Sequence, residues 1–238
     1  MASTDINVAV LFFTRSAEAE GGCKRFAGDN CDRRHVHIAS SLIEHTRRQI
    51  RRTGLPVVEI DEKMQKGGSF GERFAHAFEQ VFNAGYEHVI AVGNDTPQLK
   101  AAHISEAARR LAAGTDDIVL GPAEDGGTWL MGYSREAFEA DSFQELPWRT
   151  PRLFDTILEQ SSDQLSIARL ESYADIDNHA SLVSFIGNAQ FLQPLFHLIH
   201  LIRGILAGYS DQFKQECLQT PTSPASSSLL LRAPPFIA

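Results

Sequence analysis

Short apolar runs alternate with longer helical patterns along the chain. The apolar runs are rich in β-branched residues and have the length of buried strands. They occupy residues 6–13, 56–60, 88–92, 118–120 and 128–133. Between them, apolar residues recur every three or four positions at residues 36–50, 70–83 and 98–113. This alternation predicts βαβ units, and therefore an α/β fold with a mostly parallel central sheet flanked by helices.

In such a sheet, ligands bind outside the carboxyl ends of the strands. This rule selects the loops that follow three of the predicted strands, at residues 14–32, 93–99 and 121–127. All three loops contain glycine together with charged side chains, which are the residue types that a charged ligand needs.

Asp95 is the leading candidate in the loop of residues 93–99. A carboxylate at a strand end suits a hard cation such as Mg²⁺, which proteins hold with one or two carboxylates plus substrate phosphates. Gly93 would let the backbone approach a ligand closely, and Pro97 would start the next helix. The alternative is that Asp95 merely caps the helix that begins near residue 98 or bonds inside the turn.

Asp125 is the candidate in the loop of residues 121–127, where Gly126 and Gly127 give the backbone unusual freedom. The alternative is a plain Asp-Gly hairpin turn between the two neighbouring strands.

Residues 14–32 form a polar loop with positive charge, and we expect its Thr14, Arg15 and Lys24 to contact phosphate. Gly21 and Gly22 would add close backbone contact with the ligand. Neither GxxxxGK[ST] nor GxGxxG occurs there, so the loop is not one of these phosphate-binding motifs. The alternative is a solvated loop with ordinary surface charges.

Asp175 and Asp177 stand two residues apart on an extended segment, which places them on the same side of the backbone. Asp177 could supply a second metal contact. The alternative is that it caps the helix beginning near residue 179.

Composition narrows the choice of partners. The 238 residues carry a formal net charge of -8, which argues against a general nucleic-acid binder. The three cysteines lack CxxC spacing, and the N-terminus does not resemble a signal peptide, so we expect a cytoplasmic protein. Residues 191–206 are apolar-rich but include His197, His200 and Arg203, which predicts an amphipathic or core helix rather than a membrane span.

We expect a main domain at residues 1–187, an appended helical segment at 188–217 and a Pro/Ser/Thr-rich flexible tail at 218–238. The helical segment could pack on the domain or on a second subunit of a homo-oligomer.

The motifs resemble those of a bacterial family of unknown function whose members are often labelled glycosyltransferases. That family lies in the nucleotide-diphospho-sugar transferase superfamily and is related to molybdenum-cofactor and phospholactate nucleotidyltransferases. The resemblance spans about residues 6–180 and rests on a GxDxPxL motif, a GPAxDGGxxLxG motif and weaker marks. These are Gly68–Arg73, Gly93–Leu99, Gly121–Gly132, Pro147–Thr150 and Asp175–Asp177.

The resemblance implies a Rossmann-like GT-A fold that binds a nucleotide through Mg²⁺ or Mn²⁺. By this analogy Asp95 takes the place of the metal-ligating aspartate, and together with the residue patterns above we expect a further metal contact at Asp177 and catalytic roles for Asp125 and Lys24. The remaining implied contacts are nucleotide binding by Thr14, Arg15, Lys24, Gly93 and Asp95, and substrate binding by Gly126, Gly127 and Trp148. The family's Pro-Gly-x-x-Lys-Thr-Arg-Leu stretch is altered here, because only Lys24 is retained in place.

These observations predict a metal-dependent transferase with a nucleotide or nucleotide-sugar donor and a small-molecule acceptor. Glycosyl transfer is favoured by the family label. The alternatives are nucleotidyl transfer from a nucleoside triphosphate, and a non-catalytic nucleotide-binding or scaffold protein on a decayed transferase fold.

Overall fold

The computed structural model describes residues 7–28, 32–161, 165–188 and 195–208. These residues form two compact units. The first comprises residues 7–16 and 42–176, and the second comprises residues 17–41 and the residues from 177 onward.

The first unit is built on a six-stranded sheet, counted among the described residues. Its strands are β1 (Val8–Phe13), β2 (Val57–Ile60), β3 (His88–Val92), β4 (Ile118–Pro122), β5 (Thr128–Ser134) and β6 (Ile167–Arg169). Their order is β2-β1-β3-β5-β4-β6, and β5 alone in this sheet runs against its neighbours. The predicted α/β fold with a mostly parallel sheet is therefore confirmed.

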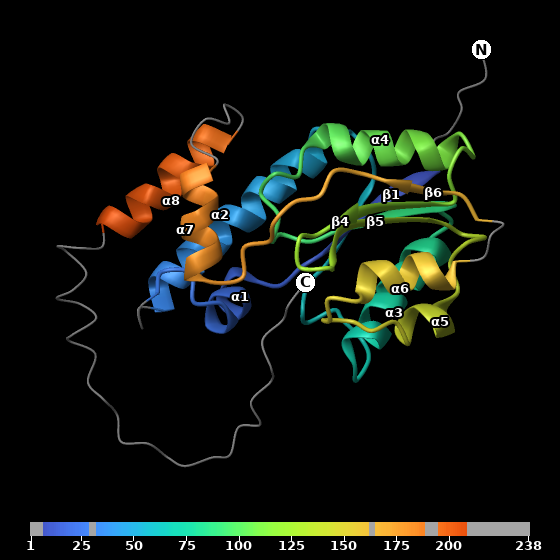
Figure 1. Ribbon diagram of the computed structural model, residues 1–238, viewed down its shortest axis with the longest axis horizontal. Coiled ribbons are helices and arrows are strands. Elements are labelled where there is room, and N and C mark those ends of the chain that lie inside the picture. The colour runs from blue at the N-terminus through green and yellow to red at the C-terminus, as the bar shows by residue number, and fades with distance from the viewer. Residues whose placement is uncertain (1–6, 29–31, 162–164, 189–194, 209–238) are drawn as a thin grey trace. The chain divides into compact units, whose positions relative to one another are not determined.

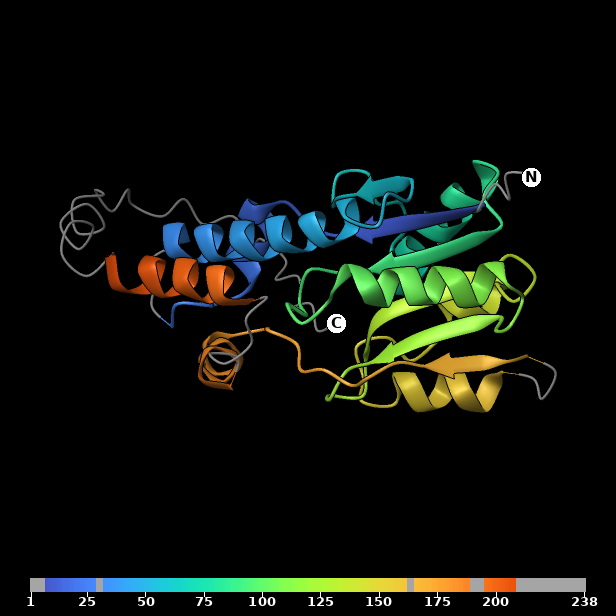
Figure 2. The same ribbon diagram turned by 90° about the horizontal axis from the view of Figure 1, so that it is seen from above.

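Helices cover both faces of this sheet (Figures 1 and 2). On one face lie α3 (Phe70–Asn83), α5 (Ala140–Gln144) and α6 (Leu153–Gln160), and on the other lies α4 (Ala101–Ala112). The fold begins α3 with a capping box, in which the Ser69 side chain accepts from the Glu72 backbone N–H and the Glu72 carboxylate accepts from the Ser69 backbone N–H.

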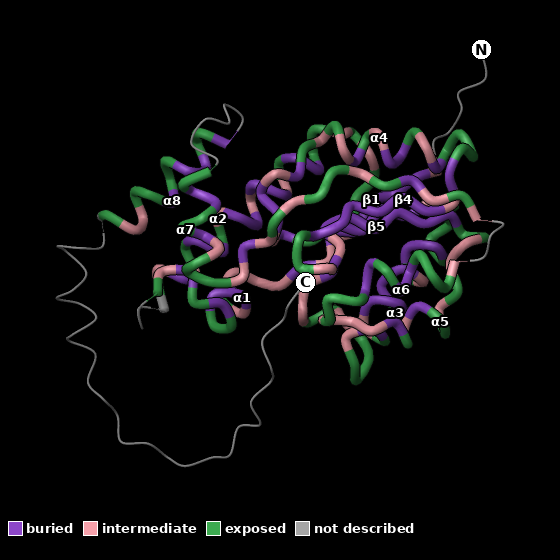
Figure 3. The backbone as a smooth tube through the Cα atoms, in the orientation of Figure 1, coloured by how far each residue is buried: buried purple, intermediate pink, exposed green. Residues whose placement is uncertain are grey.

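The core of the first unit lies between the sheet and α3 and includes a cluster of aromatic rings. The strands and the inner faces of the helices are buried, and the outer faces of the helices are exposed (Figure 3). Phe78 is fully buried and contacts several aromatic rings. It stacks on Phe138, and the two ring centres are 5.1 Å apart. This burial is the main favourable term that holds the helices on the sheet.

The second unit contains α1 (Ala17–Cys23), the first part of α2 (Asp32–Arg51), α7 (His179–Asn188) and α8 (Phe196–Gly208). The sequence predicted a loop over residues 14–32, and this prediction is wrong for Ala17–Cys23. The segment reads AEAEGGC, and its alanines and glutamates favour helix. Gly21 lets α1 pack closely on α2, since a Cβ there would lie 2.6 Å from the Val36 backbone nitrogen. Gly21 thus has a packing role, and its expected contact with a ligand stays a prediction.

Other departures from the sequence concern short elements. The apolar patterns did not predict α5, α6 or β6, which are five, eight and three residues long. The expected cap of α7 was also wrong, because the side chain of Asn178 rather than that of Asp177 accepts from the Ser181 backbone N–H. The expected division at residue 187 stays a prediction. The expected tail at residues 218–238, and residues 209–217 before it, lie outside the described residues.

Within the described ranges, none of the helices has the length and apolar character needed to cross a membrane.

A glycine on the inner face of α3 yields a test of the core. A Cβ on Gly71 would lie 2.1 Å from the Gln144 carbonyl oxygen and 2.7 Å from the Trp148 indole. We expect Gly71→Ala to lower the free energy of unfolding by about 1–3 kcal/mol, because the overpacked helix must shift. Chemical denaturation measures the change. Gly187→Ala in α7, where no atom lies within 4 Å, is the control. Equal stability of Gly71→Ala and wild type would contradict the packing described.

Candidate functional site

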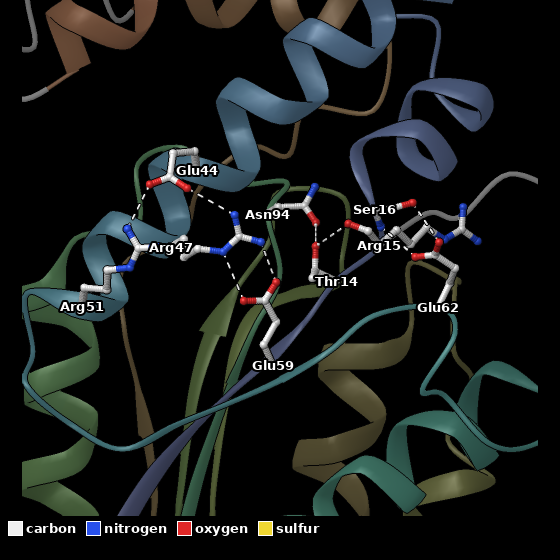
Figure 4. A network of polar contacts seen from close by, with 9 residues as sticks. All are labelled: Thr14, Arg15, Ser16, Glu44, Arg47, Arg51, Glu59, Glu62 and Asn94. Carbon is white, nitrogen blue, oxygen red and sulfur yellow. Dashed lines mark hydrogen bonds and ion pairs between the residues drawn. The ribbon is translucent and has the colours of Figure 1, made fainter.

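Two of the predicted loops meet at the carboxyl edge of the sheet. The parallel register of β1 and β3 pairs Leu11 with Ala91 and Phe12 with Val92. The chain therefore leaves both strands at the same level, and the Thr14 hydroxyl donates a buried 2.8 Å hydrogen bond to Asn94 Oδ1. Figure 4 shows the two side chains pointing toward one another. This bond fixes the start of the loop that carries Asp95.

Asp95 is held at the end of β3 by its neighbours. Its Oδ1 accepts from Asn94 Nδ2 at 2.9 Å, and its backbone carbonyl accepts from the Ile176 N–H at 2.8 Å. The alternative in which Asp95 caps a helix is wrong, because α4 begins at Ala101 with Lys100 at its N-cap position.

A second carboxylate lies beside this loop. The Thr96 hydroxyl donates to Asp175 Oδ1, so Asp175 lies next to the residue that follows Asp95. The sequence assigned the second metal contact to Asp177. The i, i+2 spacing that pointed to Asp177 includes Asp175, but it could not show which of the two carboxylates lies by Asp95.

The donor set fits a metal that arrives with a phosphate ligand. Asp95 and Asp175 come from two segments of the first unit, and no group of three or more His, Cys, Asp or Glu side chains suited to a metal occurs among the described residues. Mg²⁺ is commonly held by one or two carboxylates together with substrate phosphates and water. A metal at Asp95 would therefore need the ligand's oxygens to complete its coordination.

The far end of the same loop is anchored by His45, on the part of α2 that belongs to the first unit. Its Nε2 lies 3.0 Å from the Pro97 carbonyl oxygen, which requires the Nε2–H tautomer. Burial lowers the pKa of His45, and the positive charges of Arg48 and Arg52 lower it further. The imidazole is therefore neutral in the folded protein at neutral pH.

Asp125 occupies a tight hairpin between β4 and β5. Its Oδ1 accepts from the Gly127 N–H at 2.9 Å, and Gly126 has a φ of 90°, in the region that favours glycine. A Cβ at Gly126 would lie 2.0 Å from the Pro151 carbonyl oxygen. The backbone is thus the Asp-Gly turn that was the structural alternative, and the Asp125 side chain is exposed on it.

The segment of residues 170–176 joins this hairpin to the Asp95 loop. Its backbone donates from Tyr173 to Pro122 and from Ile176 to Asp95. The Tyr173 hydroxyl donates to Glu171 at 2.6 Å, and burial, followed by this hydrogen bond, raises the pKa of Tyr173 to about 12. Tyr173 is therefore protonated near neutral pH and is not a general base.

Trp148 lies against the aromatic core rather than standing alone. Its indole N–H donates to the Phe143 carbonyl at 3.0 Å, and its ring lies 5.2 Å from that of Phe70. The half-buried face of Trp148 remains the part that a substrate could contact.

Lys24 and Asp177 come together in the second unit. Lys24 is 3% exposed, and its Nζ lies 2.8 Å from Asp177 Oδ1 and 3.2 Å from Glu20 Oε1. Lys24 is therefore a buried, paired charge and not part of a solvated loop. The predicted roles of these two residues toward metal and phosphate stay predictions.

Two arginines of α2, Arg47 and Arg51, are paired with carboxylates. Arg47 lies 2.5 Å from Glu59 Oε1, and both Arg47 and Arg51 contact Glu44 (Figure 4). These contacts explain the basic face of the helix without a nucleic-acid partner.

The sheet order, the reversed strand and the loops at the carboxyl edge define a Rossmann-like α/β fold. The chain belongs to the bacterial family described as "uncharacterized protein conserved in bacteria (DUF2064)", whose model matches residues 24–150. No curated protein matches the sequence.

Among solved structures, the fold is similar to that of a candidate nucleotide-diphospho-sugar transferase from Desulfovibrio desulfuricans G20. That protein is 20% identical, with a TM-score of 0.73, and the match covers 85% of this chain and 98% of that chain.

Weaker similarity extends to a cytidylyltransferase from Leptospira borgpetersenii, at 12% identity and a TM-score of 0.45, covering 84% of this chain and 93% of that chain. A mannosyltransferase from Pyrobaculum calidifontis, in complex with GDP-Man and Mn²⁺, is 12% identical with a TM-score of 0.40, and the match covers 84% and 69% of the two chains. Similarity at this level establishes nothing further.

The His45 anchor predicts how stability depends on pH. Because the folded-state pKa of His45 lies below its ordinary value of 6.5, the unfolded chain binds more protons once the pH falls below about 6.5. We expect the free energy of unfolding to fall as pH decreases through this range. We expect His45→Gln, whose amide can still donate to Pro97, to flatten the slope. Denaturant melts at pH 5 to 8 measure it, with the exposed His76→Gln as the control. An unchanged slope in His45→Gln would exclude this anchor as a source of acid sensitivity.

Proposed function

We propose that this protein is a metal-dependent transferase that uses a nucleotide-activated donor, and that it transfers a glycosyl group from a nucleotide-diphospho-sugar. The observation that carries the proposal is the placement of Asp95 at the carboxyl end of β3, where the Thr14–Asn94 bond, Ile176 and His45 hold its loop. The shared fold with a candidate nucleotide-diphospho-sugar transferase supports the class of donor.

The donor would bind through its phosphates. Asp95 would hold Mg²⁺ or Mn²⁺, and the bound ion would neutralise charge on the diphosphate. Thr14 and Arg15 are the proposed phosphate contacts of the first unit. Gly93 is exposed, and no atom lies within 4 Å of the position of a Cβ there, so its backbone offers an open surface to the donor.

The acceptor would bind near the hairpin of β4 and β5. An acceptor hydroxyl oxygen would attack the anomeric carbon of the donor sugar as the bond from that carbon to the diphosphate oxygen breaks. The Asp125 carboxylate would take the hydroxyl proton, and the nucleoside diphosphate would leave with the bonding electron pair. Gly126, Gly127 and Trp148 are the proposed contacts with the acceptor.

A thermal-shift panel tests the donor class. Nucleotide sugars and nucleoside triphosphates are each added with Mg²⁺, with Mn²⁺ or with EDTA. A ligand at about 100 times its dissociation constant adds roughly 2.7 kcal/mol to stability. We expect a metal-dependent shift with a nucleotide sugar, and its loss in Asp95→Asn because an amide is a poor ligand for a hard cation. Asp155→Asn on α6 is the control.

A shift confined to nucleoside triphosphates would replace glycosyl transfer by nucleotidyl transfer. No shift with any nucleotide would favour the non-catalytic alternative.

A second prediction separates binding from folding at Gly93. A valine side chain there would project into open space, so we expect Gly93→Val to melt like the wild type without ligand. It should bind the donor at least about tenfold more weakly, a loss of about 1.4 kcal/mol, because the side chain blocks the backbone surface. Isothermal titration with the best donor from the panel measures the loss. Wild-type affinity in Gly93→Val would show that the donor does not approach this backbone.

A further inference from the structure

A cleft with a volume of about 600 Å³ lies in the first unit, at the edge of the sheet opposite to Asp95. Ile118, which begins β4, and Tyr133 of β5 both line it. Tyr133 pairs with Ile118 and with Val89, near the amino end of β3, whereas Asp95 follows the carboxyl end of that strand. The cleft is therefore separate from the candidate site, and its volume is typical of sites for small molecules.

The floor of the cleft is apolar. It lies on the face of the sheet that carries α3, α5 and α6, and side chains of α5 and α6 take part in the lining (Figure 1). Its buried apolar residues are Ile118, Phe143, Leu146 and Ile157. They also belong to the core of the first unit, so the packing of the fold holds this floor in place. A ligand with an apolar body would remove the remaining surface of the floor from water.

Tyr133 is the buried polar residue of the lining. Its side chain is 5% exposed, and its ring packs edge-on against Phe78 and Phe143. The Tyr133 hydroxyl makes no hydrogen bond with any residue that the structure describes, and burial raises the pKa of Tyr133, so the group stays protonated. A buried tyrosine hydroxyl usually has a hydrogen-bond partner, which indicates that a ligand in the cleft supplies it.

The rim of the cleft is negatively charged. Glu136, Glu139 and Glu145 line it, and all three are exposed. Glu139 accepts from the Ser142 hydroxyl at 3.4 Å, and none of the three carboxylates forms an ion pair within the described part of the chain. The described lining contains no Lys, Arg or His. The charge of the lining therefore favours a cation over an anion.

The carboxylates are not arranged as a metal centre. Within the described ranges, no group of three or more His, Cys, Asp or Glu side chains is suited to hold a metal ion. A hard metal ion prefers oxygen ligands and would make no use of the apolar floor. An organic cation uses both features, because carboxylates attract its ammonium group while its apolar body packs on the floor and against aromatic rings.

We propose that this cleft binds a small organic cation that carries an ammonium group on an apolar body. The ammonium group would donate to the Tyr133 hydroxyl oxygen, in the field of the three carboxylates, and the apolar body would pack on Phe143 and Ile157. This second site does not depend on the proposed transferase function, because it lies at the other edge of the sheet.

Three probes that share an indole body test the charge preference. They are tryptamine, which is cationic at neutral pH, the uncharged tryptophol and the anionic indole-3-propionate. Isothermal titration of the full chain at low ionic strength measures their dissociation constants, since exposed charges are then least screened. We expect tryptamine to bind at least about threefold more tightly than tryptophol, and tryptophol more tightly than indole-3-propionate.

Two variants test the assigned groups. Tyr133→Phe removes only the hydroxyl, so we expect tryptamine to bind about threefold to tenfold more weakly. Glu139→Gln combined with Glu145→Gln should lower the affinity for tryptamine to that for tryptophol, whereas Glu136 is kept because its charge also acts on His88. The control is Glu159→Gln, an exposed residue of α6 outside the lining, which should bind like the wild type. Melting without ligand verifies that each variant folds.

The outcomes separate this site from the candidate transferase site. Asp95→Asn should bind tryptamine like the wild type, and loss of binding in that variant would place the cation at the carboxyl edge and overturn the proposal. Equal affinity for the three probes, no binding of tryptamine, or wild-type affinity in either cleft variant would also overturn it. Failure of nucleotide binding in the thermal-shift panel would remove the proposed function and leave the cation site standing.

Discussion

The candidate site depends on the parallel register of β1 and β3. Because Phe12 pairs with Val92, the two strands release the chain at the same level, and the loops after them meet through Thr14 and Asn94. A shift of one residue would turn each side chain of a strand to the opposite face of the sheet. It would also part these loops. The position of Asp95 is therefore set by backbone pairing in the buried sheet.

The reversed strand β5 has a second organising effect. It lies between β3 and β4 and runs antiparallel to both. The hairpin that joins it to β4 therefore lies at the same edge of the sheet as Asp95. The segment of residues 170–176 then bonds to both the hairpin and the Asp95 loop. Loops that are distant in sequence are thereby tied together by backbone hydrogen bonds.

The sequence predicted the long elements and the loops that could carry chemistry, because the helical period of α3 and the apolar runs of β1 and β3 are unambiguous. It missed α1, since the glycine pair Gly21-Gly22 indicated a loop, whereas only tertiary packing against Val36 explains Gly21. It also could not distinguish Asp175 from Asp177, because the choice depends on the hydrogen bond from Thr96.

The hairpin at Gly126 has a consequence for recognition. Its turn is closed by Asp125, and Pro151 fills the space beside it, so its backbone has little freedom left to lose. The conformational entropy of this loop is given up during folding rather than on encounter with a partner. A molecule that binds against the hairpin would contact a preformed surface. The selectivity of the hairpin would therefore depend on shape complementarity to a rigid surface more than on adjustment of the loop.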